Sequence, residues 1–248
     1  MHSERLVKFV ARKKVVFVIV EGPSDDDALG VILNRLYDNS QVHIEIIHGD
    51  ITADLNIQPG DIAIKLCGIV KSYAESMHFK QEDFQEIIHL VDMDGSFIPD
   101  SAIIYNPDAQ KTVYSVNKIQ TEKPERIRSR NSYKREVINR ISTLKKVWGT
   151  IPYKVYYMSC NLDHVLYDKQ NSTDEEKENN AYAFSKKYKD NIEGFLTFIS
   201  DSDFSRTDGY KESWDYIKKE FHSLERNTNL GICFADIRRK REEDFIKN

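Results

Sequence analysis

The sequence predicts an α/β protein with a doubly wound, mainly parallel sheet flanked by helices and a mostly helical C-terminal extension. Three apolar segments rich in β-branched residues alternate with two amphipathic segments, which gives the order strand, helix, strand, helix, strand. Parallel strands require such crossover connections, and these are right-handed. The chain has 248 residues, enough for one large domain or for a domain with an appended lobe.

The first half of the chain carries this pattern most clearly. A strand is expected over residues 14–21, because residues 15–20 are an unbroken apolar run, typical of a strand that is covered on both faces. A helix is expected from Pro23 to about Tyr37, with Ser24 as its N-cap. The pattern then predicts a strand at 42–48, a helix over 59–77 and a strand over 86–91.

The second half is less regular. Three prolines punctuate residues 96–128, which reads as a polar loop or insertion. Residues 169–180 are polar throughout and are expected to form a solvated loop. The remaining expected elements are helices at 131–147, 161–167 and 209–224, and strands at 154–158 and 230–237.

Composition limits the class of protein. The formal net charge is −4, so a nucleic-acid partner would have to bind at a local basic patch. The three cysteines are widely spaced and form neither a CxxC nor a Cys/His zinc pattern, which suits a reducing cytoplasm. The longest apolar runs are shorter than the roughly 20 residues of a membrane span. We therefore expect a cytoplasmic protein that does not enter a membrane.

Acidic side chains follow two of the predicted strands. Glu21 comes directly after the first strand, and Asp92 and Asp94 come after the third. The carboxyl ends of parallel strands meet at one edge of a sheet, and on an extended segment Asp92 and Asp94 would point to the same side. Taken singly, these acids are ordinary helix-capping or turn residues. Taken together they predict a site for Mg²⁺ or Mn²⁺, which prefer carboxylate oxygens.

The pair of motifs, Glu21-Gly22 and Asp92-Met93-Asp94, resembles the TOPRIM domain of type IA topoisomerases, bacterial primases and OLD-family nucleases. The resemblance implies that Glu21, Asp92 and Asp94 are catalytic metal ligands. It implies that Asp25 is a further ligand, and Asp163 is a weaker candidate. It covers residues 12–167 as a catalytic domain with an insertion at about 96–150, and leaves residues 168–248 as a helical lobe.

Missing motifs narrow the activity that the resemblance implies. The chain has no P-loop, no zinc cluster and too few further residues for the additional domains of a topoisomerase. A compact Mg²⁺-dependent endonuclease that cleaves RNA or DNA is what remains. Stand-alone proteins of this kind serve as effectors of bacterial antiphage defence, some with a separate ABC-type ATPase in trans. A homodimer is left open by the sequence.

A local excess of positive charge supports a nucleic-acid partner. Residues 111–147 contain eleven Lys and Arg against three Glu. An exposed helix face of mixed charge would show the same pattern, but the excess stands out in a net-negative chain. The densest part of the patch, expected to contact nucleic acid, is Arg126, Arg128, Arg130, Lys134 and Arg135.

Two other interpretations remain open. The segment around Asp92 also resembles haloacid-dehalogenase-type phosphatases, in which Asp92 would be the nucleophile, Asp94 the acid and Ser159 a phosphate ligand. That family places the motif on its first strand, and it gives Glu21 no role. A non-catalytic nucleic-acid-binding TOPRIM module is the second. His164 is a further candidate to approach the crevice, whereas His48 and His89 are expected to be strand or core histidines.

Overall fold

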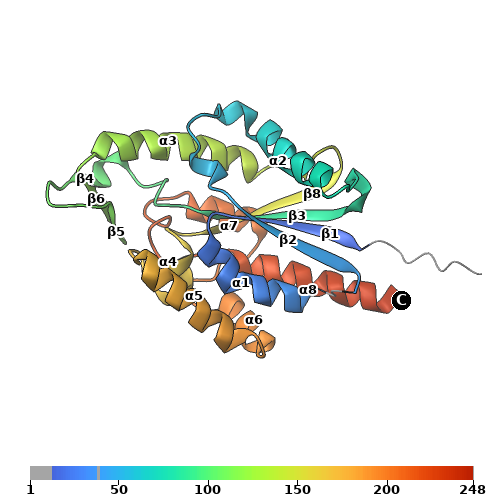
Figure 1. The fold of residues 1–248 in the computed structure, drawn as a ribbon. Coiled ribbons are helices and arrows are strands. Elements are labelled where there is room, and N and C mark those ends of the chain that lie inside the picture. The colour runs from blue at the N-terminus through green and yellow to red at the C-terminus, as the bar shows by residue number, and fades with distance from the viewer. Residues whose placement is uncertain (1–12, 38–39, 248) are drawn as a thin grey trace, which may run out of the picture.

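A computed structural model describes residues 13–37 and 40–247 (Figure 1). Residue 12, where the expected catalytic domain begins, lies outside them. The main sheet has the strand order β2-β1-β3-β8-β7. All its neighbours pair in parallel except β7 and β8. The strands are β1 (Lys14–Val20), β2 (Val42–His48), β3 (Phe84–Asp92), β7 (Lys146–Val147) and β8 (Ile151–Met158). The expected α/β class with a mainly parallel sheet flanked by helices is confirmed.

The central strand β1 shows why both faces of the sheet are covered. Its residues Val15 to Val20 are all buried, and alternate side chains enter different cores. Val16, Val18 and Val20 pack with α1 (Pro23–Leu36), whereas Val15, Phe17 and Ile19 pack with α2 (Ile62–Ser76) and α3 (Pro124–Ile141). Figure 1 shows α2 and α3 above the sheet and α1 below it.

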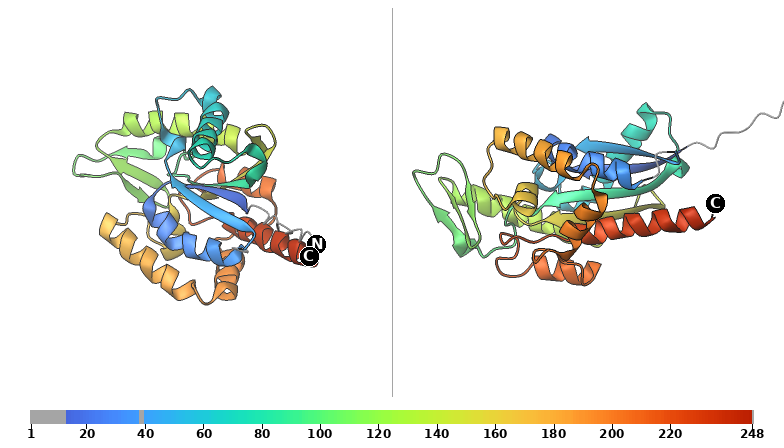
Figure 2. Two further views of the ribbon diagram at one scale, coloured as in Figure 1. Left: turned by 45° about the vertical axis from the view of Figure 1, so that its right-hand side comes forward. Right: turned by 90° about the horizontal axis from the view of Figure 1, so that it is seen from below.

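The C-terminal helices extend the same two layers. Helices α4 (Leu162–Tyr167), α5 (Asp174–Tyr188), α6 (Ile192–Asp201) and α8 (Leu230–Lys247) share the core of α1. Helix α7 (Tyr210–Ile217) packs Trp214 against Tyr157 in the other core. Figure 2 shows α8 lying along the sheet. The expected boundary between a catalytic domain and a C-terminal lobe remains a prediction.

The segment between β3 and β8 contains a second, three-stranded sheet. Its strands β4 (Ile103–Tyr105), β5 (Val113–Ser115) and β6 (Lys118–Thr121) have the order β4-β6-β5. A small core of its own, which includes Ile103 and Ile119, joins it to the body. The expectation of a polar loop here was incomplete, because these strands are too short and mixed in polarity to give a clear period.

Several expected elements are wrong at their boundaries or in type. The loop at 169–180 ends at Thr173, whose hydroxyl and the Glu176 carboxylate form the capping box that starts α5. The strand expected at 230–237 is wrong, because this segment is the start of α8, whose buried side chains there are Leu230, Cys233, Phe234 and Ile237. Helix α3 begins at Pro124 and ends at Ile141, earlier than expected at both ends, and α7 ends at Ile217.

The start of α1 also differs from the expectation. Gly22, not Ser24, is the N-cap, because Pro23 occupies the first helical position, where its missing N–H costs nothing. The Asp25 carboxylate accepts a hydrogen bond of 3.0 Å from the Gly22 backbone N–H. The motif Glu21-Gly22 therefore lies at the junction of β1 and α1.

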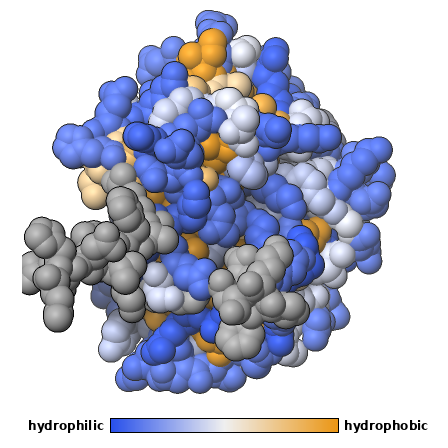
Figure 3. Space-filling view, turned by 90° about the vertical axis from the view of Figure 1, so that its right-hand side faces the viewer, coloured by the Kyte–Doolittle hydropathy of each residue, from blue (hydrophilic) through white to orange (hydrophobic). Residues whose placement is uncertain are grey.

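No helix among the described residues is both long and apolar enough to cross a bilayer. The parallel strands run from right to left in Figure 1, so their carboxyl ends face the small sheet. The opposite end of the molecule, shown in Figure 3, is largely hydrophilic with scattered apolar side chains.

Candidate functional site

The strand order places a crevice between the carboxyl ends of β1 and β3. Strand β1 lies between β2 and β3; the crossover from β1 to β2 runs over one face of the sheet through α1, and the crossover from β2 to β3 runs over the other face through α2. At such a switch point the loops that follow the two strands run in opposite directions and leave a space between them. Open α/β sheets bind their ligands in this space. Glu21 follows β1 and Asp92 ends β3, so both residues flank this crevice.

Hydrogen bonds show that the two strand ends meet. Glu21 Oε1 accepts a bond of 2.9 Å from the backbone N–H of Asp92. The same oxygen lies 3.4 Å from the hydroxyl of Thr52, which also donates to Asp50 at 2.9 Å. Thr52 belongs to η1 (Ile51–Ala53), the short helix after β2. Three neighbouring strands therefore contribute to one cluster of oxygen atoms.

Asp94 reaches the crevice through a turn. The expectation that Asp92 and Asp94 share one side of an extended segment is wrong, because β3 ends at Asp92 and Asp94 has φ +50°. Gly95 follows with φ +64°, and a Cβ on it would lie 2.5 Å from the buried Leu224. Glycine is required there by both backbone and space, and the turn brings the Asp94 carboxylate to α3.

Lys134 of α3 supplies the positive charge of the crevice. Its side chain is fully buried, and its ammonium group forms an ion pair with Asp94 Oδ2 and lies 3.5 Å from Glu21 Oε1. The Asp94 and Glu21 side chains are 22 % and 12 % exposed, so this charge cluster is shielded from water. The sequence placed Lys134 among residues that contact nucleic acid, but the structure places it among the carboxylates.

The crevice holds more acidic groups than Lys134 can balance if all of them ionise. Burial, together with the carboxylates of Asp50 and Asp94, raises the pKa of Glu21 to about 8 against the opposing effect of Lys134. Burial and the carboxylates of Glu21, Asp25 and Asp94 raise the pKa of Asp92 well above its usual range. Lys134 and Arg130 lower the pKa of Asp94 despite its burial. An additional cation would relieve this repulsion.

The carboxylate oxygens of the crevice suit a divalent cation that keeps some of its bound water molecules. Asp92 Oδ1 is buried and has no hydrogen-bond partner, so an oxygen ligand is available. Within the described ranges, no three His, Cys, Asp or Glu side chains form a complete metal site. Mg²⁺ usually takes one or two carboxylates and completes its octahedron with water and phosphate oxygens. Asp92, with Glu21 or Asp94, could hold such an ion.

A second acidic group lies beside the crevice, at the starts of α1 and α4. Asp25 and Asp163 are both buried, and burial, with the Asp163 charge, raises the pKa of Asp25 to about 6. Asn180 contacts Asp163 Oδ1 at 3.4 Å.

His164 is buried, its Nε2 lies 3.7 Å from Asp168 Oδ1, and burial lowers its pKa to about 4. His164 is therefore neutral at pH 7 and faces Asp168.

Some residues of the expected basic patch form ion pairs or hydrogen bonds within the fold, and others do not. Arg128 pairs with Glu125, and Arg135 lies 3.6 Å from Asp100. Arg130 donates to the Asp94 carbonyl at 2.8 Å and to the Tyr114 hydroxyl at 2.7 Å, so it braces the turn after β3. Arg126 is exposed and forms no ion pair with any described residue.

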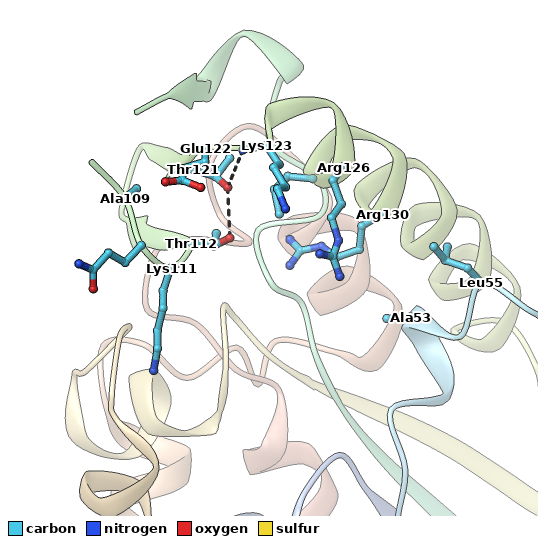
Figure 4. A pocket seen from close by; sticks show the side chains of 12 residues that line it. Ala53, Leu55, Ala109, Lys111, Thr112, Thr121, Glu122, Lys123, Arg126 and Arg130 are labelled. Carbon is cyan, nitrogen blue, oxygen red and sulfur yellow. Dashed lines mark hydrogen bonds between the residues drawn. The ribbon is translucent and has the colours of Figure 1, made fainter. Parts of the chain in front are cut away.

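Arg126 and Arg130 line a pocket of about 490 Å³ between α3, the small sheet and η1 (Figure 4). Two of its lysines, Lys111 and Lys123, belong to the basic stretch 111–147 that the sequence predicted, although not to its densest part. Sequence reasoning missed Asn131, which is fully buried and donates to the Gly95 carbonyl at 3.3 Å. A signal for Asn131 was present: Asn131 and Lys134 interrupt the apolar stripe of α3 formed by Ile127, Ile138 and Ile141.

No family model, curated protein or solved structure matches this chain.

Proposed function

We propose that this protein is a Mg²⁺- or Mn²⁺-dependent nuclease of TOPRIM-like fold that hydrolyses phosphodiester bonds of RNA or DNA. The observation that carries the proposal is the bond from the Asp92 backbone to Glu21 Oε1, which joins the two acidic motifs at one crevice. The excess negative charge there and the free Asp92 Oδ1 suit a divalent cation. The neighbouring basic pocket suits the phosphates of a polynucleotide.

The chain's own residues would share the chemistry. A bound divalent ion supplies activation of water and charge stabilisation at the phosphoryl group. Asp92 and Asp94 would hold it, with Lys134 fixing the Asp94 carboxylate. Glu21, with a pKa of about 8, is suited to exchange a proton near neutral pH. Arg130 holds the turn that presents Asp94.

The alternative phosphatase mechanism has less support. It requires the Ser159 hydroxyl as a phosphate ligand, but Ser159 is fully buried and its Oγ accepts a bond of 2.7 Å from the Asn227 backbone. It also leaves Glu21 without a role, although Glu21 contacts Asp92 directly. These contacts favour a nuclease.

The test is to incubate the purified chain with RNA, DNA and a generic phosphomonoester in Mg²⁺, Mn²⁺ or EDTA. We expect polynucleotide cleavage with either ion and none in EDTA. Glu21→Gln and Asp92→Asn should abolish cleavage, whereas Glu75→Gln, an exposed acid on α2, should not. Full cleavage by both crevice variants would exclude the nuclease, and release of phosphate alone would favour the phosphatase. Binding of polynucleotide without products in either ion would favour a non-catalytic module.

The biological role that we propose is that of an antiphage effector that acts with a separate ATPase, as in the stand-alone TOPRIM nucleases that the motifs Glu21-Gly22 and Asp92-Met93-Asp94 resemble. Its test is the plating efficiency of phage on cells that express the wild type or Asp92→Asn, each with its neighbouring genes. Equal protection by the two would contradict an effector role for the crevice.

A further inference from the structure

The pocket beside the crevice combines several kinds of wall. Four cationic side chains line it, Lys111, Lys123, Arg126 and Arg130, against a single acid, Glu122, among the lining residues that the structure describes. Figure 4 shows Arg126 and Arg130 on the side of α3, Thr112, Thr121 and Glu122 on the small sheet, and Ala53 and Leu55 on a third side. The volume of about 490 Å³ is within the range of small-ligand pockets.

The cations of this pocket are available to a ligand. Lys111, Lys123 and Arg126 are exposed, and none of them forms an ion pair with a described residue. Other basic side chains of the same region, such as Arg128 and Arg135, are paired with acids. Several unpaired cations around one cavity repel each other, so an anion with several acceptor oxygens would be stabilised there.

The rest of the lining indicates more than a bare anion. Leu55 is 62 % exposed and offers an apolar surface to a ligand, and Ala53 and Ala109 add to the apolar lining. Glu122 offers acceptors to a hydroxyl or amino group. These three kinds of lining match the parts of a nucleotide. The apolar side suits the base, the cationic side suits the phosphate, and the carboxylate suits the hydroxyl and amino donors.

The pocket also connects to the acidic crevice through two residues. Arg130 lines it and donates to the Asp94 carbonyl, while Ala53 lines it and follows Thr52, which contacts Glu21. A nucleotide in the pocket would therefore touch residues that are themselves in contact with, or next to, the residues of the acidic crevice.

We infer that this pocket binds one nucleotide of the substrate, with its phosphate on Arg126 and Lys123 and its base against Leu55. The inference rests on the proposed nuclease function for its biological meaning. It adds a defined subsite that selects a phosphorylated nucleotide unit next to the scissile bond.

The test measures binding of AMP, UMP, adenosine and inorganic phosphate by titration calorimetry in EDTA at fixed ionic strength. Cleavage is not involved, so this result is independent of the nuclease assay. We expect at least one monophosphate to bind tighter than both adenosine and phosphate. Arg126→Ala should weaken it about tenfold, the effect of losing one charge-assisted hydrogen bond. Leu55→Ser should weaken the monophosphate but not phosphate.

The matched control is Arg140→Ala, which removes an exposed arginine from the same helix outside the pocket. It should leave the affinity unchanged. The inference is overturned if neither monophosphate binds, if phosphate binds as tightly as the monophosphates, or if Arg140→Ala weakens binding as much as Arg126→Ala. Loss of cleavage in Asp92→Asn with AMP or UMP binding retained would separate the crevice from the subsite.

Discussion

The acidic crevice and the basic pocket share α3 but treat charge in opposite ways. In the crevice, Lys134 is fully buried and pairs with Asp94 and Glu21. In the pocket, Arg126, two helical turns earlier, is exposed and has no partner among the described residues. A buried charge needs a partner within the fold, whereas an exposed charge is hydrated and can later pair with a ligand. The crevice charges should therefore govern stability, and the pocket charges should govern binding.

Lys134→Met gives the largest expected effect on stability. It leaves the buried carboxylates of Asp94 and Glu21 without their cation, which should cost about 3 to 5 kcal/mol of unfolding free energy. Urea denaturation in EDTA at neutral pH measures it, with Arg140→Met, at an exposed position of the same helix, as the control. A loss below about 1 kcal/mol would remove the contrast between the two regions.

Asp25→Asn tests whether the crevice is destabilised by its own negative charge. Asp25 holds its proton more tightly in the folded chain, with a pKa of about 6 against an ordinary 3.8, so wild-type stability falls as the pH rises between these values. The amide can still accept from Gly22 but carries no charge. The variant should equal the wild type at about pH 3, below both pKa values, and exceed it by about 3 kcal/mol above about pH 7.

Denaturation in EDTA across this pH range provides the measurement. Asp27→Asn, an exposed acid of the same helix, is the control and should change little at any pH. A variant that is less stable than the wild type at pH 7 would contradict the charge excess.

Gly95→Ala addresses the turn that presents Asp94. A Cβ at φ +64° and 2.5 Å from Leu224 should cost about 2 kcal/mol from strain and overpacking. Gly68→Ala in α2, where the added Cβ has open space, should have the opposite sign and stabilise by about 0.5 to 1 kcal/mol. Thermal denaturation of both variants compares them directly. Equal effects would mean that the turn is not held by the contacts described.

Arg126→Ala gives the smallest expected change in stability. The unfolding free energy should stay within about 0.5 kcal/mol of the wild type, because the side chain is exposed and has no partner to lose. The same variant should lose nucleotide affinity. Urea denaturation beside calorimetry checks both, and a large loss of stability would show that Arg126 belongs to the structural group with Lys134.

The parallel strands were predictable because continuous β-branched runs reflect burial on both faces, as in Val15–Val20 of β1. The meeting of Glu21 with Asp92 followed from strand direction alone. The start of α5 was missed because its first residues are polar and the capping signal, Thr173 with Glu176, was overlooked. The strand expected at 230–237 failed because a short apolar run has no period that separates a strand from a buried helix.

The partner of the carboxylates was less accessible to sequence reasoning. Lys134 reads as one member of a basic run, and its burial depends on the packing of α3 against the sheet, which brings distant residues together. The interrupted apolar stripe at Asn131 and Lys134 would have indicated buried polar groups, but not their partners. The basic pocket depends on the small sheet, whose three strands were not predicted.

The small sheet also has a consequence for how this architecture can diversify. Strands β3 and β8 are direct neighbours, and the chain between them leaves the main sheet after β3 and returns through the short edge strand β7 before it enters β8. The small sheet is thus part of a connection, where changes of length are tolerated. We expect that the stretch from β4 to β6 can be exchanged, provided that α3 keeps Asn131 and Lys134 in place and that the new stretch replaces the Tyr114 hydroxyl as a partner of Arg130. Grafting such a stretch would change the lining of the basic pocket, and therefore its ligands, while the carboxylates of the crevice keep their positions.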